Sequence, residues 1–320
     1  MSYLEAIWKG IIKSIKEGTL VSKNLFPMII SIIVLVKILQ ELNIIQYVAM
    51  PLEPIMQTMG LPAEFGIVWA CAMLVNIYSA LALIPSMLLL VPSVTVEQMT
   101  ILGLIILIAH SLILETKIAG RCGLSMSFQV GLRLITAWIC GVSVHLICSH
   151  FGFWQETAIV LFKAGAALDF TGWVFGELKN LVQIYCIICL VMMFNKIINA
   201  LKISQFVGFI LGPLLRILGI SKEATNIVIV GLVLGILYGS GIIIQAATEG
   251  RISRIDAFTT MSLMSIAHAL IEDTILLSLL GGSLWGLLGV RLIFAISVGV
   301  SINLLYAKKQ QQLELEKGTA

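Results

Sequence analysis

The sequence predicts an all-α integral membrane protein built from two homologous repeats. Of its 320 residues, 59% are hydrophobic and 12% are charged, whereas a soluble domain carries about a quarter charged residues. Apolar runs approach the ~20 residues that a membrane-spanning helix needs; examples are residues 25–39, 65–91, 101–114, 181–194, 227–247 and 287–305. Because these runs are continuous rather than alternating, they do not fit the strands of a membrane barrel.

The second observation is an internal repeat. Residues 131–147 (GLRLITAWICGVSVHLI) and 289–305 (GVRLIFAISVGVSINLL) are identical at nine of seventeen positions. Two further matches keep the same order and nearly the same spacing: 108–116 with 266–274, and 37–56 with 196–215. Shared hydrophobicity alone would not align the charged residues of these segments, so we infer a duplication.

Each repeat is expected to hold the same series of elements. The series is an amphipathic segment, a spanning helix, a short proline-bearing segment, a long helix with a soft centre and two further spanning helices. In the first repeat (1–150) these are 1–22, 24–42, 44–60, 64–91, 96–118 and 128–150. In the second (151–307) they are 156–177, 179–200, 203–219, 223–247, 254–280 and 284–307, followed by a polar tail, 308–320. The short segments are too short to span and are expected to be re-entrant or interfacial.

The distribution of positive charge favours repeats of opposite direction. Lys308 and Lys309 place the C-terminus inside, so that the uncharged link at 281–282 lies outside. In the first repeat the corresponding loop carries Lys117 and Arg121 and should lie inside. The segment 156–177 is the candidate for the extra crossing that inversion requires. Other cations (Lys202, Arg216 and Lys222) would fall outside, so a parallel arrangement stays open.

Three stretches carry a resemblance to a known family. They are PLEPIMQTMGLPAE (51–64), NIYSALALIPS (76–86) and AHSLILETKIAGRCG (109–123), with their partners in the second repeat. They resemble the Gate, or nucleoside-recognition, membrane domains, a class shared with the core of ferrous-iron transporter B, spore maturation proteins A and B, and concentrative nucleoside transporters. The resemblance implies a transporter-like inverted-repeat fold with a site between the repeats. The Asn-Ala-Thr-Pro and Gly-Xaa-Ser-Xaa-Pro turns of better-known members are absent, so nucleoside or iron specificity does not carry over.

Ionisable residues inside apolar segments are the first functional candidates, because they are costly at membrane depth. His110 and His268 occupy matching positions, with Glu115 and the pair Glu272 and Asp273 about one turn further on. His268 and Glu272 are four residues apart and would share a helix face. Their chemistry suits an ion- or proton-coupled site. Helix-to-helix hydrogen bonding is the structural alternative.

Small and polar residues at the soft helix centres are the second set of candidates, interpreted as lining a solute site. They are Asn76, Tyr78 and Ser79 in the first repeat, and Gly235, Gly239, Ser240 and Gln245 in the second. Glycines there allow a helix break whose backbone faces a solute, or simply close packing. Pro85 supports a break in the first repeat. Arg133 and Arg291 are interpreted as snorkelling to the interface.

The sequence gives no indication of an enzyme. It lacks the His-Glu-Xaa-Xaa-His, phosphate-loop and Gly-Xaa-Ser-Xaa-Gly patterns. The six cysteines show no metal-ligand spacing, so no cofactor is expected and the sequence leaves a metal site undetermined. A net charge of +3 gives no reason to expect nucleic acid. The expected partners are the lipid bilayer, a small solute and a coupling ion, with a homodimer as a candidate assembly.

Three functions are therefore considered. The first is a secondary transporter or permease for a small solute in the plasma membrane, typically a bacterial inner membrane, working by alternating access between inverted repeats. The second is a non-transporting membrane scaffold needed for assembly of a partner complex. The third, with less support, is a transition-metal permease that uses the histidines and carboxylates.

The inverted arrangement makes a topological prediction. Reporter fusions after Arg121 and after Gly282 should report opposite sides of the membrane, since these links follow matching helices of repeats that point in opposite directions. Reporters on the same side would establish parallel repeats.

Overall fold

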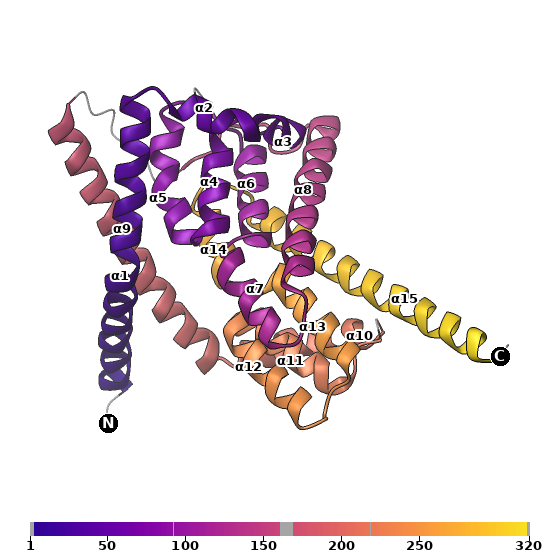
Figure 1. The fold of residues 1–320 in the computed structure, drawn as a ribbon. Helices are drawn as coiled ribbons and strands as arrows, with labels where there is room; N and C mark the ends of the chain where they lie inside the picture. The colour runs from indigo at the N-terminus through magenta and orange to yellow at the C-terminus, as the bar shows by residue number, and fades with distance from the viewer. Residues whose placement is uncertain (1–2, 92, 161–168, 218, 319–320) are drawn as a thin grey trace. The chain divides into compact units, whose positions relative to one another are not determined.

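The computed structural model describes residues 3–91, 93–160, 169–217 and 219–318, which form helices joined by turns (Figure 1). The first half holds α1 (Tyr3–Glu41), α2 (Ile45–Ala49), η1 (Met50–Leu52), α3 (Glu53–Thr58), α4 (Glu64–Leu74), α5 (Ile77–Leu88), α6 (Val96–Ile108), α7 (Leu112–Arg121) and α8 (Met126–Phe151). The second half holds α9 (Phe170–Ala200), α10 (Ile203–Ile217), α11 (Lys222–Leu234), α12 (Ile236–Thr248), α13 (Arg254–Ala267), α14 (Glu272–Ser278), η2 (Gly286–Val290) and α15 (Arg291–Gly318). The predicted all-α fold class is confirmed.

Six helical segments of the described chain are long and apolar enough to cross a membrane. They are Gly10–Glu41, Val96–Arg121, Met126–Phe151, Phe170–Ala200, Arg254–Ser278 and Gly286–Leu305. Large apolar side chains on these helices are exposed, among them Ile135, Trp138 and Ile139 on α8. Such an exposed apolar surface suits contact with lipid rather than with water. The chain is thus an integral membrane protein.

At the start of each repeat, the predicted amphipathic segment is not a separate element of the described structure or is described only in part. Residues 1–22 and 24–42 were expected to be separate, but α1 continues through both, with Pro27 inside it. Hydrophobic packing supports its second part, where Ile29 and Ile33 join Ile184 and Ile188 of α9 in one buried cluster. Of the predicted amphipathic segment 156–177, residues 161–168 lie outside the described residues.

Matching positions of the two halves share unusual backbone conformations. Four pairs of residues, 158 or 159 apart, have positive φ: Asn43 with Lys202, Gly60 with Gly219, Ser111 with Ala269, and Gly123 with Gly281. Most residue types avoid this region, so chance agreement at four turns is improbable. The correspondence seen in the sequence therefore extends to the backbone, while the relative direction of the repeats stays a prediction.

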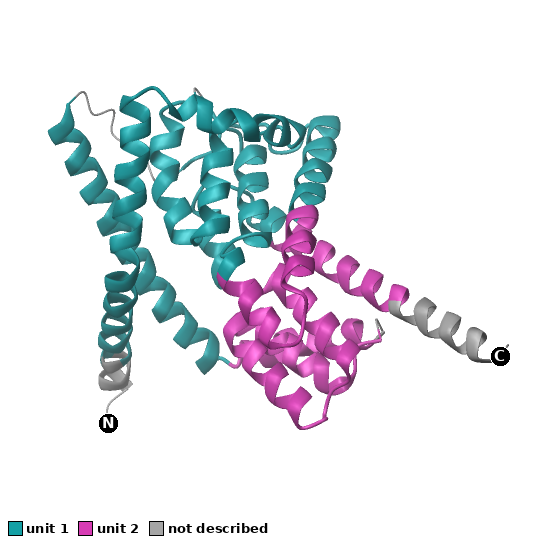
Figure 2. Cartoon of the chain, viewed as in Figure 1, with its two compact units in different colours: residues 1–113, 137–201, 272–287 teal, residues 114–136, 202–271, 288–320 magenta. Residues whose placement is uncertain are grey.

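The described chain forms two compact units that interleave along the sequence (Figure 2). Unit 1 comprises residues 1–113, 137–201 and 272–287; unit 2 comprises 114–136, 202–271 and 288–320. Unit 1 therefore contains α14 from the second half of the chain, and unit 2 contains α7 from the first half. Each unit is assembled from both halves, and α7 and α14 occupy matching places in the repeat.

The long helices with predicted soft centres are indeed broken. Helix α4 gives way to α5 at Asn76, which has an extended backbone (φ −170°). Helix α11 gives way to α12 at Gly235, with φ +94° and ψ +166°. Pro85 lies inside α5, so the break is not where that proline would place it. A side-chain cap at Asn76 and the conformational freedom of glycine at Gly235 are the local causes.

The following helices, predicted to be continuous over 96–118 and 254–280, are also broken, and that prediction was wrong. The chain leaves helical geometry at Ser111 (φ +46°) and at Ala269 (φ +44°). There the backbone N–H of Ser111 donates to the carbonyl of Ala72 (2.8 Å), and that of Ala269 donates to the carbonyl of Gly231 (3.4 Å). Bonds to a neighbouring broken helix replace bonds within the helix, a tertiary effect that no local residue signals.

The conformation of Gly235 makes a testable prediction about stability. Its φ and ψ lie in a region that is essentially restricted to glycine, whereas space is not limiting, since an added Cβ would lie 3.9 Å from the nearest atom. Gly235→Ala should lower the free energy of unfolding by ~1–3 kcal/mol. Gly241→Ala is the control, because Gly241 is helical with nothing within 4 Å. Thermal unfolding in detergent measures both, and equal melting temperatures would contradict the prediction.

Candidate functional site

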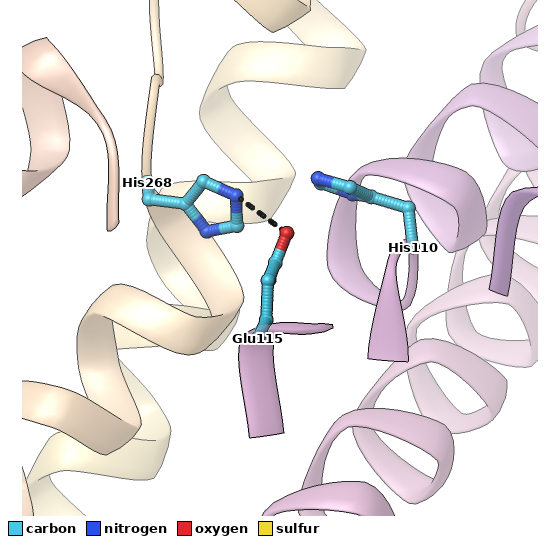
Figure 3. A group of neighbouring side chains, drawn as sticks. All are labelled: His110, Glu115 and His268. Atoms are coloured by element: carbon cyan, nitrogen blue, oxygen red, sulfur yellow. Dashed lines mark ion pairs between the residues drawn. The ribbon is translucent and has the colours of Figure 1, made fainter. Parts of the chain in front are cut away.

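A buried cluster of charged and titratable side chains lies in unit 2. Nη1 of Arg133 is 2.7 Å from Oε2 of Glu115, and Nε2 of His268 is 3.4 Å from Oε1 of the same carboxylate. Figure 3 shows His268 and Glu115 directed toward one another. The exposed fractions are 0% for Arg133, 6% for Glu115 and 4% for His268. A carboxylate thus lies between a permanent cation and a titratable imidazole, out of contact with bulk solvent.

Three elements of unit 2 position this cluster. Glu115 is in the first turn of α7, Arg133 is on α8, and His268 ends α13 with an extended backbone (φ −83°, ψ 165°). The helix break gives His268 this extended backbone and places it at the end of α13, beside Glu115. The break therefore creates the site as well as interrupting the helix.

The hydrogen bonding of His268 determines what the pair can do chemically. Nδ1 of His268 lies 2.9 Å from the carbonyl oxygen of Met264. A carbonyl only accepts hydrogen bonds, so Nδ1 carries a hydrogen there, and Nε2 carries one only when the ring is doubly protonated. A hydrogen bond between Nε2 and Glu115 therefore needs one more proton, on the imidazole or on the carboxylate. With one such proton, the two groups can form that hydrogen bond.

A second buried arginine holds the helix break itself. Arg291 has no exposed surface; its Nε donates to the carbonyl of Ile266 (2.8 Å) and its Nη2 to the carbonyl of His268 (2.9 Å). These carbonyls belong to the last turn of α13, where backbone oxygens lack helical partners. The interpretation of Arg133 and Arg291 as snorkelling residues was wrong. Their recurrence at matching positions of the repeat was the available signal of a buried role.

The matching histidine, His110, belongs to unit 1 and has the same local bond. Its Nδ1 lies 2.9 Å from the carbonyl oxygen of Ile106, the residue four positions earlier, as in His268. Next to it, Oγ of Ser111 donates to the carbonyl of Val75 at the first broken helix (3.3 Å). His110 is also labelled in Figure 3. In both halves, then, a histidine bonded to its own helix marks the break.

The predicted pairing of His268 with Glu272 was wrong. The chain is not helical between them, so the four-residue spacing does not place them on one face. Glu272 begins α14 and belongs to unit 1, where its Oε2 accepts a hydrogen bond from Nδ2 of Asn195 on α9 (2.6 Å). Asp273, half-buried, follows it in the first turn of α14. Glu115 is the carboxylate beside His268 instead.

In unit 1 the predicted solute-lining residues gather at the break between α4 and α5. Oδ1 of Asn76 accepts a hydrogen bond from the backbone N–H of Ser79 (2.9 Å) and caps α5. Ser79 is fully buried, and half-buried Tyr78 packs against the apolar cluster around Ile29. Asn76 and Ser79 thus form the cap that starts α5, next to the helix break.

In unit 2 the predicted residues separate. Gly235 forms the break, and Gly239 packs so closely that an added Cβ would lie 2.5 Å from Cε of Met264. Ser240 is buried and its Oγ donates to the carbonyl of Leu237 (3.0 Å). Gln245 is exposed near the end of α12 and donates to Glu249, away from the break. Close packing therefore accounts for Gly239, whereas Gly235 and Ser240 keep their place beside the break.

Comparison with known proteins supports the family resemblance. Residues 181–282 match the family model Gate, described as nucleoside recognition. The chain is also similar to the uncharacterized membrane protein YvoD of Bacillus subtilis (strain 168), at 25% identity over 287 residues that cover 88% of each chain. No solved structure matches the chain.

The buried ion pair predicts a large effect of removing its carboxylate. Glu115→Gln leaves Arg133 without its charged partner in a buried place, which typically costs ~3–5 kcal/mol of stability. The matched control is Glu41→Gln, which breaks the exposed pair of Glu41 with Lys37 (2.6 Å) and should cost less than about 1 kcal/mol. Unfolding in detergent measures both variants. Equal losses would show that the pair with Arg133 is not a buried interaction in the folded protein.

Proposed function

Because residues 181–282 match the Gate family model, we propose that this membrane protein is a secondary transporter for a small solute. The observation that carries the proposal is the pair of helix breaks within each unit, at Asn76 and Ser111 in unit 1 and at Gly235 and Ala269 in unit 2. Non-helical backbone at membrane depth is tolerated where it is buried in protein or lines a water-filled cavity. In transporters, such discontinuous helices form the solute and ion sites.

The proposed mechanism is alternating access between the two repeats. Asn76, Ser79, Gly235 and Ser240 would line the solute path, since Asn76 and Gly235 lie where the helices are interrupted and the two serines lie near the starts of the helices that follow. A duplicated chain supports such a mechanism, because related repeats can exchange two similar conformations.

Proton coupling is the proposed role of Glu115 and His268. A hydrogen bond between them would require one extra proton, and binding and release of that proton would change the net charge of the buried cluster by one unit. Arg133 keeps the carboxylate compensated when the proton leaves. The backbone carbonyl of His268 accepts a hydrogen bond from Arg291. A change in the charge of the Glu115–His268 pair would therefore act at the helix break.

The same cluster gives less support to a transition-metal permease. Glu115 and His268 are ligand types that bind such metals, but Arg133 lies 2.7 Å from the carboxylate. A guanidinium at that distance would repel a divalent cation. A solute that travels with a proton fits the charges of unit 2 better.

Cysteine labelling distinguishes a transporter from a scaffold. In a variant whose six native cysteines are replaced, Ser79→Cys and Ser240→Cys should react with a membrane-impermeant thiol reagent, because a solute path must open to water in some state. The matched control is Ile135→Cys on the spanning helix α8, 59% exposed and expected to face lipid, where a thiol does not form the reactive thiolate. If Ser79→Cys and Ser240→Cys are as unreactive as Ile135→Cys, the scaffold function is favoured instead.

A further inference from the structure

A cavity of about 430 Å³ lies in unit 2 between α10 and α11, and the transport proposal does not use it. Two cations line it: Arg216, in the last turn of α10, and Lys222, in the first turn of α11. Ser204, Gln205, Thr225 and Asn226 add hydroxyl and amide groups to its wall. Such a lining offers hydrogen-bond donors and positive charge to one ligand.

Helix α10 separates this cavity from an apolar surface. Its residues Phe206, Phe209 and Ile210 are 65%, 81% and 55% exposed, whereas the residues on the cavity side follow one another four apart, from Ser204 through Gly208 and Gly212 to Arg216. A helix with one exposed aromatic face and one polar face lies at the boundary between hydrocarbon and headgroups. On such a helix, the cavity side would lie at the level of the lipid phosphates.

The positive charge of the cavity is not neutralised by a lining carboxylate. Among the described residues that line it there is no aspartate or glutamate. The acidic neighbour of Lys222, Glu223, pairs with Arg251 at 2.7 Å, and Arg251 also pairs with Glu249. Nε of Arg216 donates to the carbonyl of Gly212 (3.3 Å), which fixes the guanidinium over the cavity side of α10. The carboxylate of Asp256 lies at the start of α11, where its Oδ1 accepts a hydrogen bond from the backbone N–H of Ser221 (3.1 Å), and Asp256 does not line the cavity.

The first repeat provides an internal comparison, because it lacks these features. At an offset of 159, the residues matching Arg216, Lys222 and Asn226 are Gln57, Ala63 and Ile67. Gln57 donates instead to Glu53 (2.8 Å), so the place of the arginine is neutral and filled by a local bond. The cationic cavity is therefore a property of the second repeat and is not required by the shared fold.

We propose that this cavity binds a phosphate group, presented by an anionic phospholipid headgroup or by a soluble phosphate. Arg216 and Lys222 would contribute charge-assisted hydrogen bonds, and Asn226 and Gln205 neutral ones. A guanidinium binds two phosphate oxygens at once, and a lysine adds a point charge. The ligand stabilises the junction of α10 and α11 and so acts on unit 2 independently of the proton site.

The test uses the purified full chain in a zwitterionic detergent. Its melting temperature is measured during titration with short-chain phosphatidylglycerol, with short-chain phosphatidylcholine, and with potassium phosphate against potassium chloride of equal ionic strength. The test variants place the residues of the first repeat in the cavity, as Arg216→Gln and Lys222→Ala. The control is Lys202→Asn, which removes a nearby exposed charge outside the cavity, with Asn suited to the positive φ of that position.

The wild-type protein and Lys202→Asn should be stabilised by phosphatidylglycerol or by phosphate, and not by the matched salt. Each cavity variant should weaken the apparent affinity about tenfold, as loss of a charge-assisted hydrogen bond does. Stabilisation by the lipid alone identifies a headgroup, and stabilisation by both identifies the phosphate itself. Lys222→Arg keeps the charge and should retain binding, which separates recognition from folding. Absence of a phosphate-specific shift in the wild type, or equal affinity in Lys222→Ala, would overturn the proposal.

Discussion

A backbone amide in the hydrocarbon layer must find a partner within the protein, and this constraint explains most of the architecture. Each unit contains two helix breaks, and the backbone at one break donates a hydrogen bond to the helix that ends at the other. Ser111 donates to Ala72 in unit 1, and Ala269 donates to Gly231 in unit 2, at matching positions of the repeat. Leu270 adds a second bond, of 2.7 Å, to Leu232. At each pair of breaks, a backbone N–H that has left its own helix is thus satisfied by a carbonyl of the other broken helix.

The charged cluster of unit 2 follows from the same constraint. The end of α13 exposes carbonyls, and Arg291 satisfies those of Ile266 and His268. With its backbone extended there, His268 directs Nε2 toward Glu115, which Arg133 compensates. Removing any one of these groups deletes a buried charge or a buried hydrogen-bond donor from the cluster, which costs more than the intact interaction contributes. The residues that hold this break and its charges are thus the ones to which our proposal assigns proton coupling.

The sequence predicted the features that are written in local residue types. The long apolar runs and the duplication can be found by inspecting the sequence. The breaks at Asn76 and Gly235 are indicated by a capping asparagine and by a glycine, respectively. The histidines and Glu115 were found by their rarity at membrane depth.

What the sequence did not predict depends on contacts between distant segments. The breaks at Ser111 and Ala269 lack a glycine or proline, since bonds to another helix cause them. Pairing by helical spacing consequently assigned Glu272 to His268, although the chain is not helical between them. The burial of Arg133 and Arg291 likewise depends on the packing of α8 and α15. Residue type alone predicts that an arginine extends to the membrane surface.

The central claim, that solute movement is coupled to the proton shared by Glu115 and His268, is tested most directly by proton flux. Reconstituted wild-type protein and His268→Gln are compared in liposomes that contain a pH-sensitive dye, with solutes chosen by a thermal-shift screen of nucleosides, nucleobases and organic anions. The account predicts proton entry that depends on a solute in the wild type and its loss in a folded His268→Gln protein. Solute movement with no accompanying proton, or unchanged proton entry in the variant, would contradict it.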